Sequence, residues 1–409
     1  MTPTEAARLD ALIAEREAAQ RAFLAALVKT PSDNPPGDCA PHAARAVELL
    51  EALGHTVERH HVPEARARAT GMISATNLVV RHRFGEGPTI ALNAHGDVVP
   101  PGEGWSQDPY GAAVVDGEMY GRGAAVSKSD FATYAFALDV LKHSGLPLKG
   151  TVELHFTYDE EIGGEIGPGF LIGEGLTKPD YVISAGFSYA VVVAHNGCLH
   201  LEVEVAGKSA HAALPFTGVD ALEATTGILA ALYAYRDTLK KTVSAVPGIG
   251  SPQLTVGLIS GGINTNVVPD RVTFRLDRRI VPEEQPEAVE AEVRAVIEKG
   301  AAAFPKARIS IRRILLARPL VPSEATLHLS QAIQRNAAEV LGEEIPAKGV
   351  PLYTDARLYA EAGHPVVLYG AGPRTIEEAN GHRADEKLRL SDLTLATRVI
   401  TRTLADLLS

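Results

Sequence analysis

The sequence predicts an α/β protein in which a catalytic domain, built on a largely parallel mixed sheet flanked by helices, is interrupted by a smaller ferredoxin-like α+β domain. In residues 1–196, and again in residues 319–409, short apolar runs alternate with helical patterns, which is typical of a sheet covered by helices. Between them, in residues 197–318, four strand-like and two helical segments follow one another in the order β-α-β-β-α-β. A chain of 409 residues is also long for one ordinary core.

The first part of the catalytic domain begins with a helix whose start is marked by Thr2, Pro3 and Glu5, a cap, a first-turn proline and a reciprocal glutamate. A second helix is expected to end at Gly54, and a third, after the second strand, at Gly145. The strands of this domain are expected in the apolar runs ATNLVVRHR, TIALNAHGDVV, GTVELHFTYDEE and DYVISAG, and near the end of the chain in PVVLYG.

The strands of the inserted domain carry a different pattern. The segments CLHLEVEVAG, QLTVGLISGG, RVTFRLDRRI and RISIRRILL each alternate apolar and polar residues, which predicts strands with one face in water. Helices are expected at about residues 219–240 and 284–300.

Composition excludes several classes of protein. The net charge of −11, without a cluster of Lys and Arg, argues against nucleic acid as a partner. The two cysteines, Cys39 and Cys198, exclude a Cys-rich zinc module and a disulfide framework. No run of 18 apolar residues suggests a membrane span. The N-terminal segment carries Glu5 and Asp10 where a signal peptide needs an apolar run, so the expected location is the cytoplasm.

Histidines and acids gather in three places that follow predicted strands. His95 and Asp97 form one pair, Asp159–Glu161 end the next strand, and His382 lies in a glycine-flanked loop near the C-terminus. Loops at the carboxyl ends of strands in an open α/β sheet are where ligands bind. Three such clusters favour a functional site over solvated turns.

The chain resembles the family of two-metal amidohydrolases and peptidases that includes acetylornithine deacetylase, succinyl-diaminopimelate desuccinylase, aminoacylase and carboxypeptidase G. The matching stretches, in the family's order, are HGDVVP, GRG, DEEIGG, GKSAHAALP, GGINTNVVPDR, LDRR, YTDAR and GHRADE. The resemblance covers almost the whole chain, and it implies a catalytic domain interrupted by a domain through which two copies form a homodimer.

Position by position, the resemblance implies that His95, Glu161 and His382 bind metal. It implies that Asp97 holds the imidazole of His95, which fixes the ring nitrogen that does not bind the ion. Glu160 matches the general base that takes a proton from the attacking water.

The same resemblance implies a substrate-binding set. His211 matches a residue that reaches the active site of the neighbouring subunit and helps to bind the developing oxyanion. Asn266 and Arg279 match residues that orient the substrate, and the planar guanidinium of Arg279 suits a carboxylate. The segment containing Gly370 and Gly372 is expected to form the opposite wall through its backbone groups.

The chain departs from the family at two positions. Val126 stands where relatives carry the aspartate that bridges both metals, and Phe187 stands at the position expected for an acidic ligand. One divalent ion (Zn, Mn or Co) per subunit is therefore expected rather than two, because two His and one carboxylate suffice for a single ion with open positions. Asp130 is a candidate for partial compensation, and Ser188 and Tyr189 are candidates for lining the vacated pocket.

The resulting hypothesis is a metal-dependent hydrolase that cleaves the C–N bond of an amide in a small carboxylate-bearing substrate, such as an N-acyl amino acid or a dipeptide. Hydrolytic deamination of an aryl or heteroaryl amine is an alternative, since it uses the same activated water and base. A metal-free relative that acts as a binding protein is the other alternative. A serine hydrolase is disfavoured because the segment after Ser188 has the pattern of a strand, whereas a nucleophile elbow leads into a helix.

Overall fold

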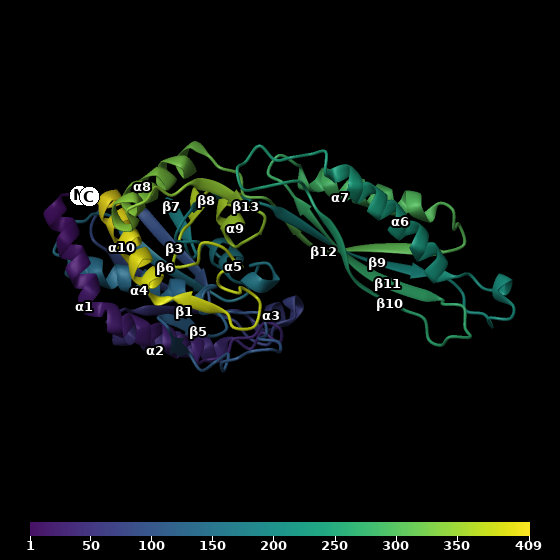
Figure 1. Cartoon of the computed structure of the whole chain (residues 1–409), viewed down its shortest axis with the longest axis horizontal. Coiled ribbons are helices and arrows are strands. Elements are labelled where there is room, and N and C mark those ends of the chain that lie inside the picture. Colours follow the sequence, from purple (N-terminus) through teal and green to yellow (C-terminus); the bar gives the residue numbers. More distant parts are fainter. The chain divides into compact units, whose positions relative to one another are not determined.

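The computed structural model describes all residues from 1 to 409. The chain forms two compact units (Figure 1). The larger unit contains Met1–Val193, Pro322–Lys348 and Thr354–Ser409, and the inserted unit contains Ala194–Val321 and Gly349–Tyr353. The sequence placed the inserted domain at residues 197–318, without the short segment that ends at Tyr353. None of the helices is both long enough and apolar enough to cross a lipid bilayer.

An eight-stranded mixed sheet forms the centre of the larger unit, in the order β1-β2-β6-β3-β7-β14-β8-β13. Its strands are β1 (Val57–His61), β2 (Thr76–Arg83), β3 (Thr89–His95), β6 (Thr151–Thr157), β7 (Tyr181–Ser184), β8 (Val191–His195), β13 (Ala347–Val350) and β14 (Val366–Leu368). The neighbours β6, β3, β7 and β14 pair in parallel, so their carboxyl ends meet at one edge. The α/β fold predicted from the alternating pattern is confirmed.

Helices cover this sheet, and a small antiparallel sheet adjoins them. The helices are α1 (Pro3–Val28), α2 (Ala40–Ala52), α3 (Glu64–Thr70), α4 (Lys128–His143), α5 (Pro168–Gly173), α8 (Glu324–Leu341), α9 (Ala356–Glu361), α10 (Leu390–Leu407) and the short 3₁₀ turn η1 (Glu160–Ile162). The small sheet contains β4 (Ala113–Val115), β5 (Glu118–Tyr120) and β15 (Lys387–Arg389). At the start of α1, Thr2 and Glu5 form the expected capping box. Helix α4 packs against α1, α10, β3 and β6 and is buried along almost its whole length.

The inserted unit has the predicted β-α-β-β-α-β order. Its elements are β9 (Gly197–Ala206), the 3₁₀ turn η2 (Pro215–Thr217), α6 (Ala221–Leu239), β10 (Leu254–Gly261), β11 (Arg271–Ile280), α7 (Pro286–Ala301) and β12 (Arg308–Ala317). The strands form an antiparallel sheet in the order β10-β11-β9-β12, the ferredoxin-like arrangement. Figure 1 shows α6 and α7 along one face of this sheet. The alternate residues Leu199, Leu201 and Val203 of β9 are buried in the core of this unit, so the polar side chains between them lie on the other, open face.

Candidate functional site

Three candidate residues converge where β3 and β6 end. His95 is the last residue of β3, and it pairs with Thr157 at the end of β6. Three residues beyond Thr157 the turn η1 begins, and its first residues are Glu160 and Glu161. Because the two strands run in parallel, their ends bring these side chains together. The ligand atoms of His95, Glu160 and Glu161 all lie within 4.8 Å of one another, and we call this group the His95 cluster.

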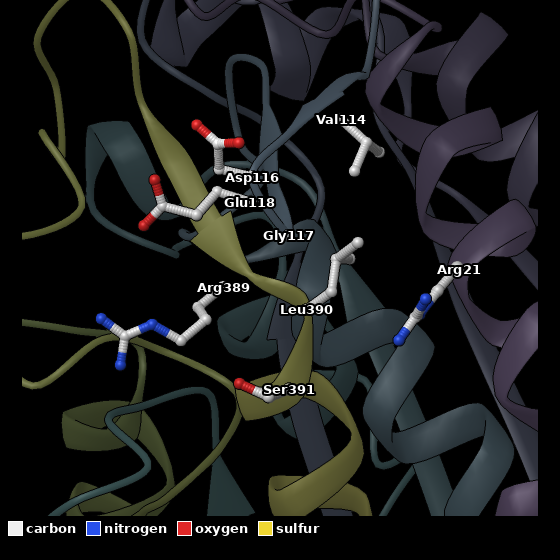
Figure 2. Close-up of a pocket in the computed structure, with 8 residues that line it drawn as sticks. All are labelled: Arg21, Val114, Asp116, Gly117, Glu118, Arg389, Leu390 and Ser391. Atoms are coloured by element: carbon white, nitrogen blue, oxygen red, sulfur yellow. The ribbon is translucent and has the colours of Figure 1, made fainter.

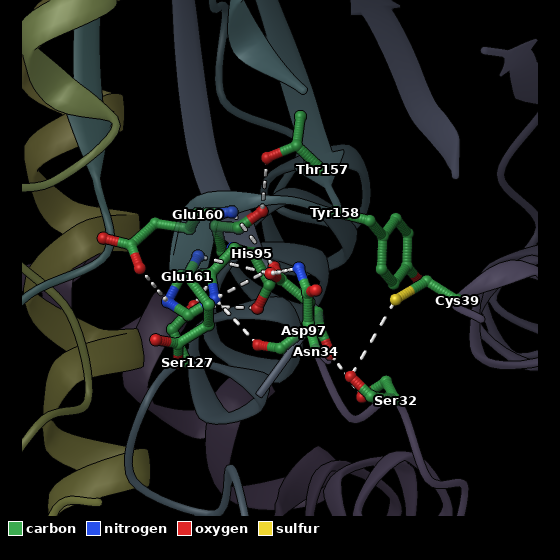
Figure 3. A network of polar contacts seen from close by, with 12 residues as sticks. Ser32, Asn34, Cys39, His95, Asp97, Ser127, Thr157, Tyr158, Glu160 and Glu161 are labelled. Atoms are coloured by element: carbon green, nitrogen blue, oxygen red, sulfur yellow. Dashed lines mark hydrogen bonds and ion pairs between the residues drawn. The ribbon is translucent and has the colours of Figure 1, made fainter. Parts of the chain in front are cut away.

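The imidazole of His95 is held from both sides (Figure 3). Its Nδ1 lies 2.9 Å from the backbone carbonyl oxygen of Asp97 and 3.4 Å from the carboxylate of that residue. Its Nε2 faces Glu160 at 3.9 Å. The hydroxyl of Ser127 accepts from the backbone N–H of His95 and donates to its carbonyl, both at 3.0 Å. Burial opposes charging of the ring, but the carboxylates around it raise the pKa of His95 well above its usual range.

The carboxylate of Asp97 mainly orients the two glutamates. It accepts the backbone N–H groups of Glu160 and Glu161 at 3.3 Å each, and the side-chain amide of Asn34 at 3.0 Å. Asp97 is completely buried. Asp97 contacts the imidazole of His95 through both its carbonyl at 2.9 Å and its carboxylate at 3.4 Å, and its carboxylate also fixes the glutamates.

His382 lies at the edge of the His95 cluster. Its Nε2 is 3.4 Å from Oε1 of Glu161, and this contact raises the pKa of His382. Its side chain is 55% exposed, and its backbone is left-handed, with φ 62°. His382 is not among the residues whose ligand atoms all lie within 4.8 Å of one another. It meets the cluster at Glu161.

Two further buried acids surround the cluster, and the sequence argument gave neither a role. Burial raises the pKa of Asp355 to about 7, and it raises the pKa of Asp159 well above its usual range, with repulsion from Asp355 adding to it. Burial also raises the pKa of Glu160 well above its usual range, and the neighbouring Glu161 and Asp355 raise it further. Buried acids so close together are costly unless a cation is near. The only available signal for Asp355 was its place in the matching stretch YTDAR.

The carboxylate of Asp130 turns away from the His95 cluster. Its Oδ1 accepts the backbone N–H of Ala371 at 2.7 Å, and the backbone of Gly186 also donates to it. A Cβ on Gly370 would overlap this carboxylate. Burial raises the pKa of Asp130 to about 7. Because these oxygens already bind backbone groups, direct metal ligation by Asp130 receives no support from the geometry.

The other residues expected near the vacated pocket are engaged in local contacts. The buried hydroxyl of Ser188 donates to the carbonyl of Gly370 at 2.8 Å. The hydroxyl of Tyr189 donates to Asp392 at 2.7 Å. A Cβ on Gly372 would overlap the carbonyl of Gly186. These glycines thus permit close backbone packing between the ends of β7 and β14.

A buried ion pair stabilises the loop that carries Val126. The Oε2 atom of Glu386 lies 2.6 Å from Nη1 of Arg122, and its Oε1 accepts the backbone N–H groups of Ala125 and Val126 at 3.1 and 3.2 Å. Each side chain of the pair is 1% exposed. The guanidinium of Arg122 also stacks over the ring of Trp105, 5.2 Å from its centroid. In the sequence, the only signal for this pair is the position of each residue in a matching stretch, GRG for Arg122 and GHRADE for Glu386.

The remaining candidates belong to the inserted unit. His211 is exposed, and its backbone bridges to Val267 beside Asn266. Arg279 lies near the end of β11, with its Nε 3.1 Å from the carboxylate of Asp277.

An open hollow of about 430 Å³ lies elsewhere on the larger unit (Figure 2). It is lined by Arg21, Val114, Asp116, Gly117, Glu118, Arg389, Leu390 and Ser391. None of the candidate site residues belongs to this lining.

Comparison with known proteins places the chain in one family. Residues 91–406 match the model of Peptidase family M20/M25/M40. The chain is 26% identical over 343 residues to an uncharacterized metallohydrolase of Methanococcus maripaludis, covering 77% of this chain and 81% of that protein. It is 28% identical over 340 residues to the succinyl-diaminopimelate desuccinylase of Wolinella succinogenes, covering 80% and 87%.

Solved structures share the fold. Human carnosine dipeptidase 1 superposes with a TM-score of 0.77 at 18% identity, covering 100% of this chain and 99% of that one. Three-quarters of the chain falls within the family match, including the residues of the His95 cluster and His382. The chain therefore belongs to Peptidase family M20/M25/M40 and is a hydrolase of that family.

Proposed function

We propose that the protein is a metal-dependent hydrolase that cleaves an amide C–N bond in a small carboxylate-bearing molecule, such as an N-acyl amino acid or a dipeptide. The observation that carries this proposal is the His95 cluster, in which one imidazole and two carboxylates lie within 4.8 Å of one another among further buried acids. Relatives in the same family are named as a desuccinylase and a metallohydrolase, which supports hydrolysis of an acyl–nitrogen bond.

We propose a single divalent ion held by His95 and Glu161, with His382, whose Nε2 lies 3.4 Å from Glu161, as the third ligand. His95, Glu161 and His382 supply two imidazoles and one carboxylate, a ligand set used by Zn, Mn or Co in sites with open positions. The buried acids beside them favour a cation. Val126 and Phe187 offer no ligand atom, so one ion per subunit is proposed rather than two. When bound, the ion would act as a Lewis acid and lower the pKa of the attacking water.

Glu160 is the proposed general base. Its backbone N–H is fixed by Asp97, and its carboxylate lies 3.9 Å from Nε2 of His95. From there it takes the proton of the attacking water and returns it to the leaving nitrogen. Arg279 and Asn266 orient the substrate in this proposal, with Arg279 binding its carboxylate.

The protein is proposed to act as a homodimer through the inserted unit. Strand β10 is the edge strand of its sheet, and it exposes Leu258 and Ile259, followed by Ile263 at 78% exposure. An edge strand with exposed apolar side chains is a surface that pairs readily with another copy. His211 lies in an exposed loop with Phe216, and in the dimer it would stabilise the oxyanion in the site of the second copy.

Metal analysis of protein purified without chelator tests this proposal. We expect about one divalent ion per subunit, and loss of turnover by roughly 10²- to 10⁴-fold in Glu160→Gln. Val126→Asp is expected to take up a second ion, since it restores a carboxylate at the position of the missing bridge. Glu202→Gln, on the open face of the inserted sheet, serves as a control with no expected effect on the ion.

The substrate panel should contain N-acyl amino acids, dipeptides and aryl amines. Release of free amino acid from compounds of the first two classes supports the proposal. If ammonia is released from the aryl amines and no amino acid is released, the activity is deamination and not amide hydrolysis. If the protein contains no ion and turns over none of these compounds, the proposal is refuted and the alternative of a metal-free binding protein is supported.

A further inference from the structure

A single carboxylate on the open face of the inserted sheet is shared by two cationic side chains. Asp277 on β11 lies directly opposite His200 on β9 in the strand register. Its Oδ2 is 3.1 Å from Nε2 of His200, and its Oδ1 is 3.1 Å from Nε of Arg279. Side chains 277 and 279 share one face because successive residues of a strand alternate. Each of the three side chains is about 30% exposed, so the group is open to solvent on one side.

The guanidinium of Arg279 is left with one open edge. Its Nε edge faces Asp277, and its plane lies over the ring of Tyr353, 5.7 Å from the centroid. The 3.1 Å approach of Nε to Asp277 is an ion-pair contact, since Oδ1 of Asp277 accepts no hydrogen bond, and neither Nη atom of Arg279 makes a hydrogen bond. The outer edge of a guanidinium carries two parallel N–H donors, which match the two oxygens of a carboxylate. The two Nη groups of Arg279 are therefore available to bind an anion.

The next acid along the same face, Glu202, contacts its arginine partners through different nitrogen atoms. Glu202, two residues after His200, is bound by Arg275 through both Nε and Nη2, and by Arg312 through both Nε and Nη2. Both of those arginines are thus already engaged by a carboxylate of the protein itself. Arg275 and Arg312 thus each give Nη2 to Glu202, whereas neither Nη atom of Arg279 makes a hydrogen bond.

The charge of the group also favours an anion. The hydrogen bond from Asp277, with a smaller contribution from Cys198, raises the pKa of His200 to about 9. Although burial acts against it, the hydrogen bond from His200 and the charge of Arg279 hold the pKa of Asp277 below its usual range. At neutral pH two positive charges therefore face one negative charge.

We propose that His200 and Asp277 are positioning residues that turn the outer edge of Arg279 toward the carboxylate of the substrate. His200 occupies one oxygen of Asp277, so the other oxygen is left for Nε of Arg279. Without His200, the carboxylate is free to rotate and to take an Nε–Nη edge of the arginine, as Glu202 does with its partners. The inference rests on the proposed function, since it assigns the carboxylate of that substrate to this place.

Kinetics on paired substrates test the proposal with the full chain. N-acetyl amino acids and their C-terminal amides, which lack the carboxylate, are hydrolysed by wild type, His200→Gln and Asp277→Asn. We expect KM for the acids to rise about tenfold in both variants, with kcat unchanged and with KM for the amides unchanged. Glu202→Gln is the matched control on the same strand and should behave as wild type. An equal rise of KM for acids and amides, or the same effect in Glu202→Gln, would overturn the proposal.

A binding measurement separates this proposal from the proposed function. In full chain labelled with ¹³C at the histidine rings, millimolar benzoate should shift the resonance of His200 in wild type but not in Arg279→Gln. Asp277→Asn should weaken the apparent affinity for benzoate about tenfold. An unshifted wild-type resonance, or unchanged affinity in Asp277→Asn, overturns the positioning role. If benzoate shifts the His200 resonance but no N-acyl amino acid is hydrolysed, the proposed activity is refuted and the carboxylate-binding role of Arg279 is still supported.

Discussion

Truncation of Glu386 is expected to destabilise the larger unit strongly. In Glu386→Ala the guanidinium of Arg122 loses its 2.6 Å partner, and the backbone N–H groups of Ala125 and Val126 lose their acceptor. Both members of the ion pair are 1% exposed, so solvent does not take over these contacts. Removing one partner of a buried ion pair costs about 3–5 kcal/mol of the free energy of unfolding.

The chain offers a matched exposed pair as a control. Nη1 of Arg45 lies 2.6 Å from a carboxylate oxygen of Glu48, the same distance as in the buried pair, but the two side chains are 42% and 64% exposed. Glu48→Ala is expected to cost no more than about 0.5 kcal/mol, because exposed ion pairs contribute little. The double variant Arg122→Met/Glu386→Gln removes both charges and keeps an acceptor for the backbone groups, so it should regain most of the loss.

Urea denaturation followed by the fluorescence of Trp105 measures these differences. Trp105 is the one tryptophan of the chain, and the guanidinium of Arg122 lies over its ring, so the probe reports on this loop. The argument from burial is refuted if Glu386→Ala unfolds at the same urea concentration as Glu48→Ala. It is equally refuted if the double variant is less stable than Glu386→Ala.

Three other expectations follow from the geometry. Gly370→Ala should lower the free energy of unfolding by about 2 kcal/mol in thermal denaturation, because the new Cβ overlaps the carboxylate of Asp130. The double variant Gly370→Ala/Asp130→Ala should recover part of this loss. The raised pKa of His200, about 9, stabilises the folded inserted unit fully below about pH 6.5, and this contribution disappears as the pH rises through 9. The urea concentration at the midpoint of unfolding should therefore fall more between pH 6 and pH 10 in wild type than in His200→Gln. An equal fall in the two proteins would contradict a stabilising charge on His200. Protein that holds its ion at a free concentration of a hundred times the Kd should lose about 2.7 kcal/mol of its free energy of unfolding when EDTA removes the ion. Glu161→Gln should show no such loss.

The sequence predicted the elements of the His95 cluster because they lie in strongly patterned segments. The apolar run before His95 and the run before Glu160 both read as buried strands, and parallel pairing of these strands brings their ends together. The ferredoxin-like order of the inserted unit was predictable for the same reason, since strands with one wet face alternate in polarity.

The pattern could not predict which atoms make the contacts. Asp97 was expected to hold His95 with its carboxylate, which lies 3.4 Å from Nδ1; that the same carboxylate also binds the backbone of both glutamates, and that the carbonyl of Asp97 lies 2.9 Å from the imidazole, was not predicted. Asp130 lies in the first turn of α4, four residues after Val126, a spacing compatible with a ligand, yet its carboxylate bonds to Ala371, 241 residues away. Such choices depend on tertiary contacts that no local spacing encodes.

Buried charged pairs were the least predictable feature. Glu386 and Arg122 are 264 residues apart, and a charged residue in a loop gives the same local signal whether it is solvated or fully buried. His200 and Asp277 were missed for a related reason, because on an alternating strand they occupy positions that read as ordinary solvent-facing residues.

The main chain at position 126 is secured from outside by Glu386, and the next residue, Ser127, brackets the backbone of His95. The backbone contacts of this loop do not involve the side chain of residue 126. Under the proposed one-ion site, a carboxylate placed at residue 126 would therefore be added without removing any of these contacts, and the number of bound ions would change without a change of fold.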